Sequence, residues 1–202
     1  MTQSLALPRE FSPHLTEDRL TVIAERLLDL RFTTLSEMAS PFDDNYTRET
    51  AIYGRQRNML IQLALNGSLP WLTLANHALD VTFRIGDIPC RFFTDDADGP
   101  QKRGFFRRNA SDNLFEIEDR IPVMWRFVVA PADLDVEEDR VYFIGYNAYQ
   151  EKVSEWVYTP TVSMLHSTSS EIPPAVELPP VGVNVRPDSD AEDRSHEARG
   201  NT

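Results

Sequence analysis

One stretch decides the fold of this chain: Leu79-Asp80-Val81-Thr82-Phe83-Arg84-Ile85-Gly86-Asp87-Ile88-Pro89-Cys90-Arg91-Phe92-Phe93. From Leu79 to Ile85, apolar and polar residues alternate with the two-residue period of a half-buried strand. Gly86-Asp87 is suited to a tight turn, and residues 88–93 alternate again as a second strand. Pro89 lacks a backbone N–H, so we expect this strand to lie at a sheet edge or to begin pairing only after the proline.

Further strands are predicted downstream of this hairpin. Three segments are dense in aromatic and β-branched residues, which favour strands: residues 123–129, 140–149 and 152–158. Residues 113–118 are a candidate for a sixth strand. The connections are too short for helical crossovers, which favours antiparallel pairing among these strands.

Two amphipathic helices are predicted upstream, at residues 17–38 and 46–65. Thr16 is a suitable N-cap for the first helix, because acidic residues follow it where the helix dipole favours negative charge. Asn66-Gly67 is a typical left-handed stop for the second. Residues 68–78 predict only a shorter helical or irregular segment that leads into the sheet.

These elements predict an α+β domain, in which the N-terminal helices pack on one face of a mostly antiparallel sheet of about five or six strands. We expect an irregular arm over residues 1–15 and the domain over residues 16–160, with its strands between about 79 and 158. Residues 161–202 are rich in Pro, Ser and acidic residues and bury too little apolar area to offset chain entropy, so we expect a disordered tail. The valines of residues 176–185 leave room for a short segment that folds on a partner.

Composition restricts the function. The 202 residues include 20 basic and 32 acidic side chains, a formal charge of −12 that opposes general binding to nucleic acids or to anionic membranes. Cys90 is the only cysteine, which excludes an internal disulfide and a cysteine-based zinc cluster. No signal peptide and no apolar run of membrane-spanning length is apparent. We therefore expect a cytoplasmic protein without a membrane segment.

A run of basic and aromatic residues at positions 102–108, called the basic run below, is the densest candidate site. Guanidinium groups bind phosphate and carboxylate in a bidentate manner, and aromatic rings stack on bases. The expected anion-binding residues are Arg84, Arg91, Lys102, Arg103, Arg107 and Arg108, with Phe105 and Phe106 for stacking. In the alternative interpretation, Asp95, Asp96 and Asp98 pair locally with these cations while the two rings pack on the core.

A metal-dependent nuclease is a second interpretation. Carboxylates that hold Mg²⁺ on a sheet are required for it, and the candidates are Asp80, Asp87, Glu116 and Glu118. The acidic-x-Lys element of restriction-type nucleases is missing, because Pro100 precedes Lys102 and Gln150 precedes Lys152 by two positions. No histidine pair has metal-ligand spacing. The sequence thus contains no positive evidence for an enzyme, and no cofactor is expected outside this alternative.

The aromatic strands suggest a protein partner. If the strands are regular, their rings fall on both faces of the sheet, and the face away from the helices exposes several tyrosines unless strand ends and loops cover them. The hairpin of residues 142–158 also offers an edge that another copy of the chain can pair with, giving a homo-oligomer. We therefore expect a non-enzymatic binding or accessory protein, with an aromatic sheet face for a protein and the Arg-rich loop for an anionic group, including nucleic acid. In this hypothesis the acidic tail competes for the basic loop.

Overall fold

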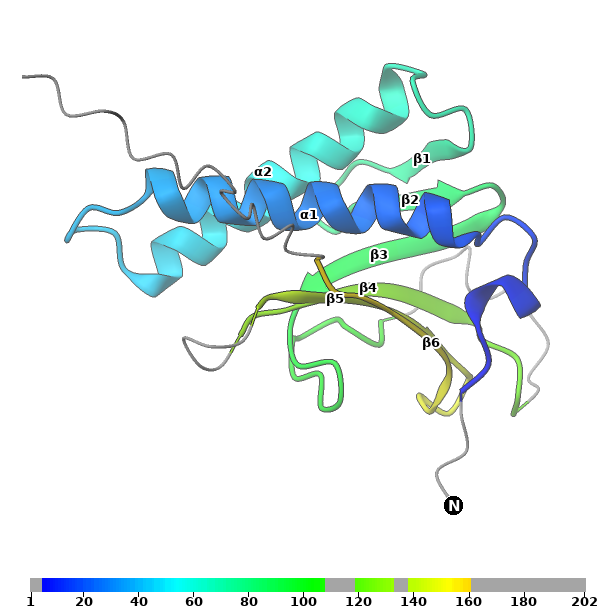
Figure 1. Cartoon of the computed structure of the whole chain (residues 1–202). Helices are drawn as coiled ribbons and strands as arrows, with labels where there is room; N and C mark the ends of the chain where they lie inside the picture. Colours follow the sequence, from blue (N-terminus) through cyan, green and yellow to red (C-terminus); the bar gives the residue numbers. More distant parts are fainter. Residues whose placement is uncertain (1–4, 108–118, 133–137, 161–202) are drawn as a thin grey trace, which may run out of the picture. The chain divides into compact units, whose positions relative to one another are not determined.

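The computed structural model describes residues 5–107, 119–132 and 138–160. Two helices, α1 (Glu17–Glu37) and α2 (Asn45–Leu65), pack against one face of a six-stranded open sheet (Figure 1). The strands are β1 (Leu72–Asn76), β2 (Thr82–Ile85), β3 (Ile88–Thr94), β4 (Met124–Ala130), β5 (Arg140–Tyr146) and β6 (Lys152–Tyr158). The predicted α+β class is confirmed.

Both helices begin and end within one residue of their predicted bounds. α1 starts directly after Thr16, although the Thr16 side chain makes no capping hydrogen bond. α2 is capped by Asp44, whose carboxylate accepts a hydrogen bond from the Thr47 N–H at 2.7 Å. Hydrogen bonding from the Thr47 side chain, and next from its backbone N–H, lowers the pKa of Asp44 below its usual value, because the charged form accepts these bonds. No helix among the described residues is long and apolar enough to cross a membrane.

The six strands lie in the sheet in the order in which they occur along the chain. All neighbouring strands are antiparallel except β3 and β4, which run parallel. The expectation that connections are too short for a crossover is wrong for this pair, because the chain between Thr94 and Met124 is long enough to return to the other end of the sheet. The structure describes this connection at residues 95–107 and 119–123.

The predicted hairpin is present, with a positive φ at Gly86 in the turn between β2 and β3. β3 is an interior strand despite Pro89, and its parallel pairing with β4 begins at Cys90 opposite Trp125. The missing N–H therefore lies just outside the β3–β4 ladder. Asp80, predicted to be part of the first strand, instead lies in a bend before β2.

The helical or irregular segment predicted at residues 68–78 is partly wrong, because Leu72–Asn76 forms the edge strand β1. Only Leu72 in this strand is buried, so its hydrophobic alternation is too short to reveal it. The candidate strand at residues 113–118 lies outside the described residues. At the opposite edge, Ala6 pairs in parallel with Ser154 of β6, and the Ser154 hydroxyl donates to the Ala6 carbonyl at 2.8 Å.

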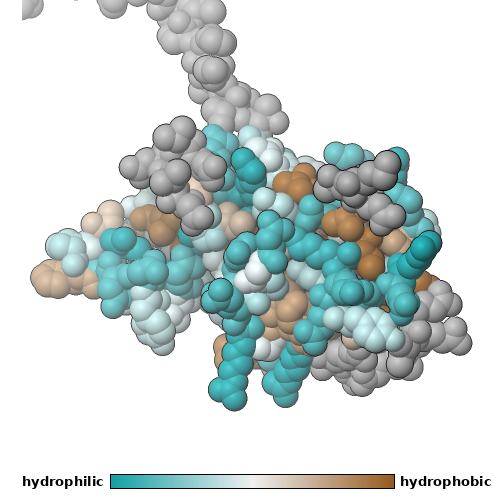
Figure 2. Space-filling view, turned by 90° about the horizontal axis from the view of Figure 1, so that it is seen from below, coloured by the Kyte–Doolittle hydropathy of each residue, from teal (hydrophilic) through white to brown (hydrophobic). Residues whose placement is uncertain are grey.

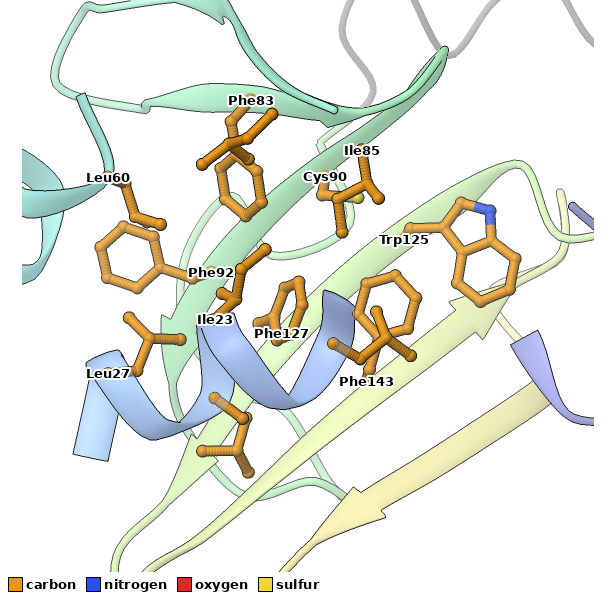
Figure 3. Close-up of a cluster of buried hydrophobic side chains, with 14 of the residues drawn as sticks. Ile23, Leu27, Leu60, Phe83, Ile85, Cys90, Phe92, Trp125, Phe127 and Phe143 are labelled. Atoms are coloured by element: carbon orange, nitrogen blue, oxygen red, sulfur yellow. The ribbon is translucent and has the colours of Figure 1, made fainter. Parts of the chain in front are cut away.

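The sheet separates two clusters of buried side chains. The helix face carries the larger, which includes Phe83, Phe92, Trp125, Phe127 and Phe143 under the helices (Figure 3). We call the opposite side the loop face, because residues of the β3–β4 connection cover it. Its cluster comprises Ala97, Phe105, Val123, Met124, Val128, Ile144 and Tyr146.

Candidate functional site

The described part of the basic run, residues 102–107, lies on the loop face, in the connection that follows β3. Asp95 shapes its start, because its carboxylate accepts hydrogen bonds from the backbone N–H groups of Gln101 at 3.0 Å and Lys102 at 2.7 Å. Asp98 forms an ion pair with Lys152 of β6 at 2.6 Å. These carboxylates thus contact backbone and β6, whereas the alternative interpretation paired them with the cations of the run.

Two buried arginines hold the run from beneath. Arg91 of β3 and Arg126 of β4 are neighbours in the parallel register, and they are 4% and 1% exposed. Arg126 donates through Nε to the Phe105 carbonyl at 3.0 Å and through Nη2 to the Arg107 carbonyl at 3.4 Å. Arg91 Nη1 donates to the carbonyls of Gly104 and Arg107, both at 3.3 Å. Buried guanidinium groups therefore satisfy three backbone carbonyls of the run and fix its path.

The two aromatic residues of the run face the sheet. Phe105 is only 1% exposed and lies edge-on to Tyr146 at 5.6 Å between ring centroids. Phe106, half-buried, lies edge-on to the same tyrosine at 5.2 Å. In this arrangement Phe105 serves as core, and its ring is not on the surface where a base stacks. The same packing buries Tyr146, so the loop face is not the open tyrosine surface that regular strands alone suggest.

Three cations in the described part of the run reach the surface. Lys102, Arg103 and Arg107 are exposed. Viewed from below the sheet, toward the loop face, the described surface is dominated by hydrophilic residues with smaller hydrophobic patches between them (Figure 2). The run thus presents positive charge from a fixed backbone.

Asp80 links the run to the bend before β2. Its carboxylate lies 3.5 Å from Arg91 Nη2 and 3.8 Å from Arg107 Nη1. Beside these three side chains is a hollow of about 340 Å³. Its lining residues are Asn76, Ala78, Leu79, Asp80, Thr82, Arg91 and Arg107. We call it the Arg91 hollow.

The pKa of Tyr53 on α2 is shifted in part by charged groups that line this hollow. Burial raises its pKa, and the Asp80 carboxylate raises it further, while Arg91 acts in the opposite direction. The Tyr53 hydroxyl donates to the carbonyl of Leu79. The helix layer therefore contacts the segment that carries Asp80.

Two of the four carboxylates expected for a nuclease, Asp80 and Asp87, lie in the described ranges, and the structure does not bring them together. Asp80 precedes β2 and Asp87 follows it, so a strand separates them by roughly 20 Å at about 3.3 Å per residue. Asp87 lies beside His14, with 3.9 Å between Oδ1 and Nε2. Within the described ranges, no group of three or more His, Cys, Asp or Glu residues is placed to hold a metal ion. Glu116, Glu118 and Arg108 lie outside those ranges.

Two residues gain roles that the sequence patterns did not assign. Arg126 was not a predicted site residue, and its only sequence signal is a lone charge in the apolar strand Met124-Trp125-Arg126-Phe127-Val128-Val129. Asp80 was a candidate metal ligand in the nuclease alternative only, and the structure places it against Arg91 and Arg107. Among the other predicted residues, Arg84 is half-buried in β2, and Cys90 is fully buried in the helix-face core.

Comparison of the chain with known protein families, curated proteins and solved structures yields no match. Any functional conclusion therefore depends on the geometry of the site alone.

Proposed function

We propose that this chain is a non-enzymatic binding protein that recognises an acidic segment of a partner protein through its basic run and the Arg91 hollow. The observation that carries the proposal is the anchoring of the run by Arg91 and Arg126. Because the buried guanidinium groups hold the backbone at Gly104, Phe105 and Arg107, little order remains to be imposed when a ligand binds.

The chemistry of the hollow favours carboxylate. Its arginines offer forked N–H donors that match the geometry of carboxylate or phosphate. Leu79, 74% exposed, and Ala78 add an apolar rim, which suits an acidic peptide that carries apolar side chains. Stacking on bases, the other requirement for single-stranded nucleic acid, is not offered by Phe105, which is buried.

The surface that we propose contacts the partner protein differs from the tyrosine face expected from the sequence. A continuous face of exposed tyrosines is replaced by the packed ring cluster around Phe105, Phe106 and Tyr146. Tyr142 stays half-buried on β5, and Val157 on β6 is 41% exposed. These residues contribute a flank to the surface, with the charged run as its centre.

The test is equilibrium binding of a fluorescein-labelled oligoglutamate peptide at low salt. Changing both Arg103 and Arg107 to Ala is expected to weaken binding roughly tenfold or more, since each removes a charge-assisted hydrogen-bond donor. Changing both Arg9 and Arg26, exposed arginines outside the run, to Ala is the charge-matched control and is expected to change little. Added salt is expected to weaken wild-type binding by screening.

Single-stranded and double-stranded DNA and RNA are tested in the same assay, with and without Mg²⁺. Tight binding to an oligonucleotide that the double variant loses, with no binding to the peptide, would replace the acidic-protein proposal with a nucleic-acid one. Loss of neither ligand in the double variant would remove the basic run from consideration as a site.

A further inference from the structure

Asp80 lies at the Arg91 hollow but forms no short hydrogen bond with either arginine that lines it. Charge-assisted N–H···O bonds are normally about 2.7–2.9 Å long. The distances from the Asp80 carboxylate are 3.5 Å to Arg91 and 3.8 Å to Arg107, both longer than a hydrogen bond of that kind. The Asp80 side chain is also 53% exposed, so water weakens both pairs.

Arg91 is held independently of Asp80. Its Nη1 donates to two carbonyls of the basic run, and its guanidinium lies over the Phe93 ring at 5.0 Å from the centroid. The side chain is only 5% exposed. The guanidinium is therefore positioned for an anion whether or not Asp80 contacts it.

The backbone that carries Asp80 is fixed by side chains of α2. Arg57 donates to the carbonyls of His77 and Ala78, and Tyr53 donates to that of Leu79. Asn76 Nδ2 lies 3.4 Å from the Asp80 carbonyl oxygen. A change at this position thus comes from rotation of the Asp80 side chain, which needs no movement of the loop.

We propose that Asp80 is an internal competitor, whose carboxylate takes the place in the Arg91 hollow that a carboxylate of the acidic partner segment occupies in the complex. The inference rests on the proposed function. On binding, the partner carboxylate bonds to Arg91 and Arg107 at hydrogen-bond distance, and the Asp80 side chain rotates out to water. Asp80 then lowers the affinity for every ligand of the hollow, because a ligand must form stronger contacts than the long ion pairs that it displaces.

The experiment compares two single substitutions in the full chain, Asp80→Asn and Asp87→Asn, using the oligoglutamate peptide. Both remove one negative charge from the β2 region, but only Asp80 contacts the arginines. Asp80→Asn is expected to tighten binding roughly fivefold at low salt, the scale of an exposed ion pair. Asp87→Asn is expected to stay within about twofold of wild type. Asp80→Asn is expected to give a smaller gain when Arg107 is already Ala, because only the pair with Arg91 is then left to break.

Each result decides the inference. An equal gain in both variants means long-range repulsion, and an unchanged affinity in Asp80→Asn means that Asp80 does not compete; either outcome overturns the inference while leaving peptide binding intact. Absence of binding in wild type and in Asp80→Asn alike overturns the proposed function itself.

A second measurement on the wild type covers the case in which Asp80→Asn is poorly folded. In amide NMR spectra, peptide addition is expected to shift the signals of Leu79 and Asp80 and to leave those of Gly86 and Asp87 in place. Shifts confined to residues 102–107 would show binding to the run without displacement of Asp80, which contradicts the inference.

Discussion

The two faces of the sheet are built differently, although they share the same strands. Phe127 lies at the centre of the helix face. Its ring centroid is 4.5 Å from that of Phe143 and 6.0 Å from that of Phe83. Its sequence neighbour Arg126 points to the loop face and is as deeply buried, but it bonds to backbone carbonyls. The helix face is held mainly by apolar packing, whereas the loop face combines a smaller apolar cluster with directed hydrogen bonds that fix a charged loop. One strand therefore contributes an apolar side chain to the core on one face and a hydrogen-bonding guanidinium that anchors the basic run on the other.

The largest effect is expected from breaking the helix face. Phe127→Ala removes a fully buried ring and is expected to lower the free energy of unfolding by about 3–5 kcal/mol, from lost apolar contact and the cavity left behind. Urea denaturation followed by circular dichroism measures it. Phe127→Leu, which retains most of the volume, is expected to cost under about 1.5 kcal/mol. If the Ala variant lost no more than the Leu variant, this face would not be the main source of stability.

A smaller effect on stability, but a specific effect on the loop, is expected from Arg126→Met. The substitution keeps an unbranched apolar stem, removes the guanidinium donor to the Phe105 carbonyl and leaves the Arg107 carbonyl with Arg91 alone, which costs about 1–3 kcal/mol. Amide hydrogen exchange at residues 102–107 is expected to accelerate more than exchange in α1. Uniform acceleration in both segments would show that Arg126 supports the whole domain and not the loop in particular.

The smallest effect concerns Tyr146, whose hydroxyl is buried without a hydrogen-bond partner among the described residues. Tyr146→Phe is expected to leave stability at neutral pH unchanged or to raise it by up to about 1 kcal/mol. Burial, and next the Glu155 carboxylate, raise the pKa of Tyr146 well above the ordinary tyrosine value of 10.0. The folded state therefore holds this proton where the unfolded chain has lost it, so stability is complete below pH 10.0 and falls as the pH rises beyond it.

Urea denaturation over an alkaline pH series checks this expectation, with a shallower decline in Tyr146→Phe than in wild type. The decline is reduced and not abolished, because burial also raises the pKa of Tyr53 and Tyr158. Equal slopes in the two proteins would contradict the buried position of the Tyr146 hydroxyl.

Lys152 links the β3–β4 connection electrostatically to the β6 edge of the sheet. Burial works against its charge, but hydrogen bonds to the carboxylates of Asp98 and Glu155 outweigh burial and raise its pKa. The ammonium group therefore stays charged at neutral pH and ties the β3–β4 connection to β6. The loop face is thus fastened by ionic contacts at its margin as well as by the arginines at its centre.

Local patterns predicted much of the fold but little of the site. The helix bounds and the β2–β3 hairpin follow from contacts between residues close in the chain, namely caps, helical periodicity and the Gly86 turn. β1 escaped prediction because its apolar alternation is too short to reveal a strand. The parallel pairing of β3 with β4 escaped prediction because its partners, such as Cys90 and Trp125, are distant in sequence. For the site, Arg91 and Arg107 were expected to bind an anion, and both line the Arg91 hollow, where that role stays a prediction. Asp80 was a metal ligand only in the nuclease alternative, and Phe105 takes the core position of the alternative interpretation of the basic run and not the stacking position of the first.

The sequence by itself determined the α+β class, the two helices, the alternation that buries Phe127 under them, and the presence of a basic run between β3 and β4. Only the tertiary structure decided what the run does with its charges. Periodicity states which side of a strand a residue occupies, but not what covers that side. The parallel crossover brings Gly104, Phe105 and Arg107 over Arg91 and Arg126, and buried guanidinium groups need acceptors. That requirement is met by backbone carbonyls more than ten residues away, which no local pattern encodes.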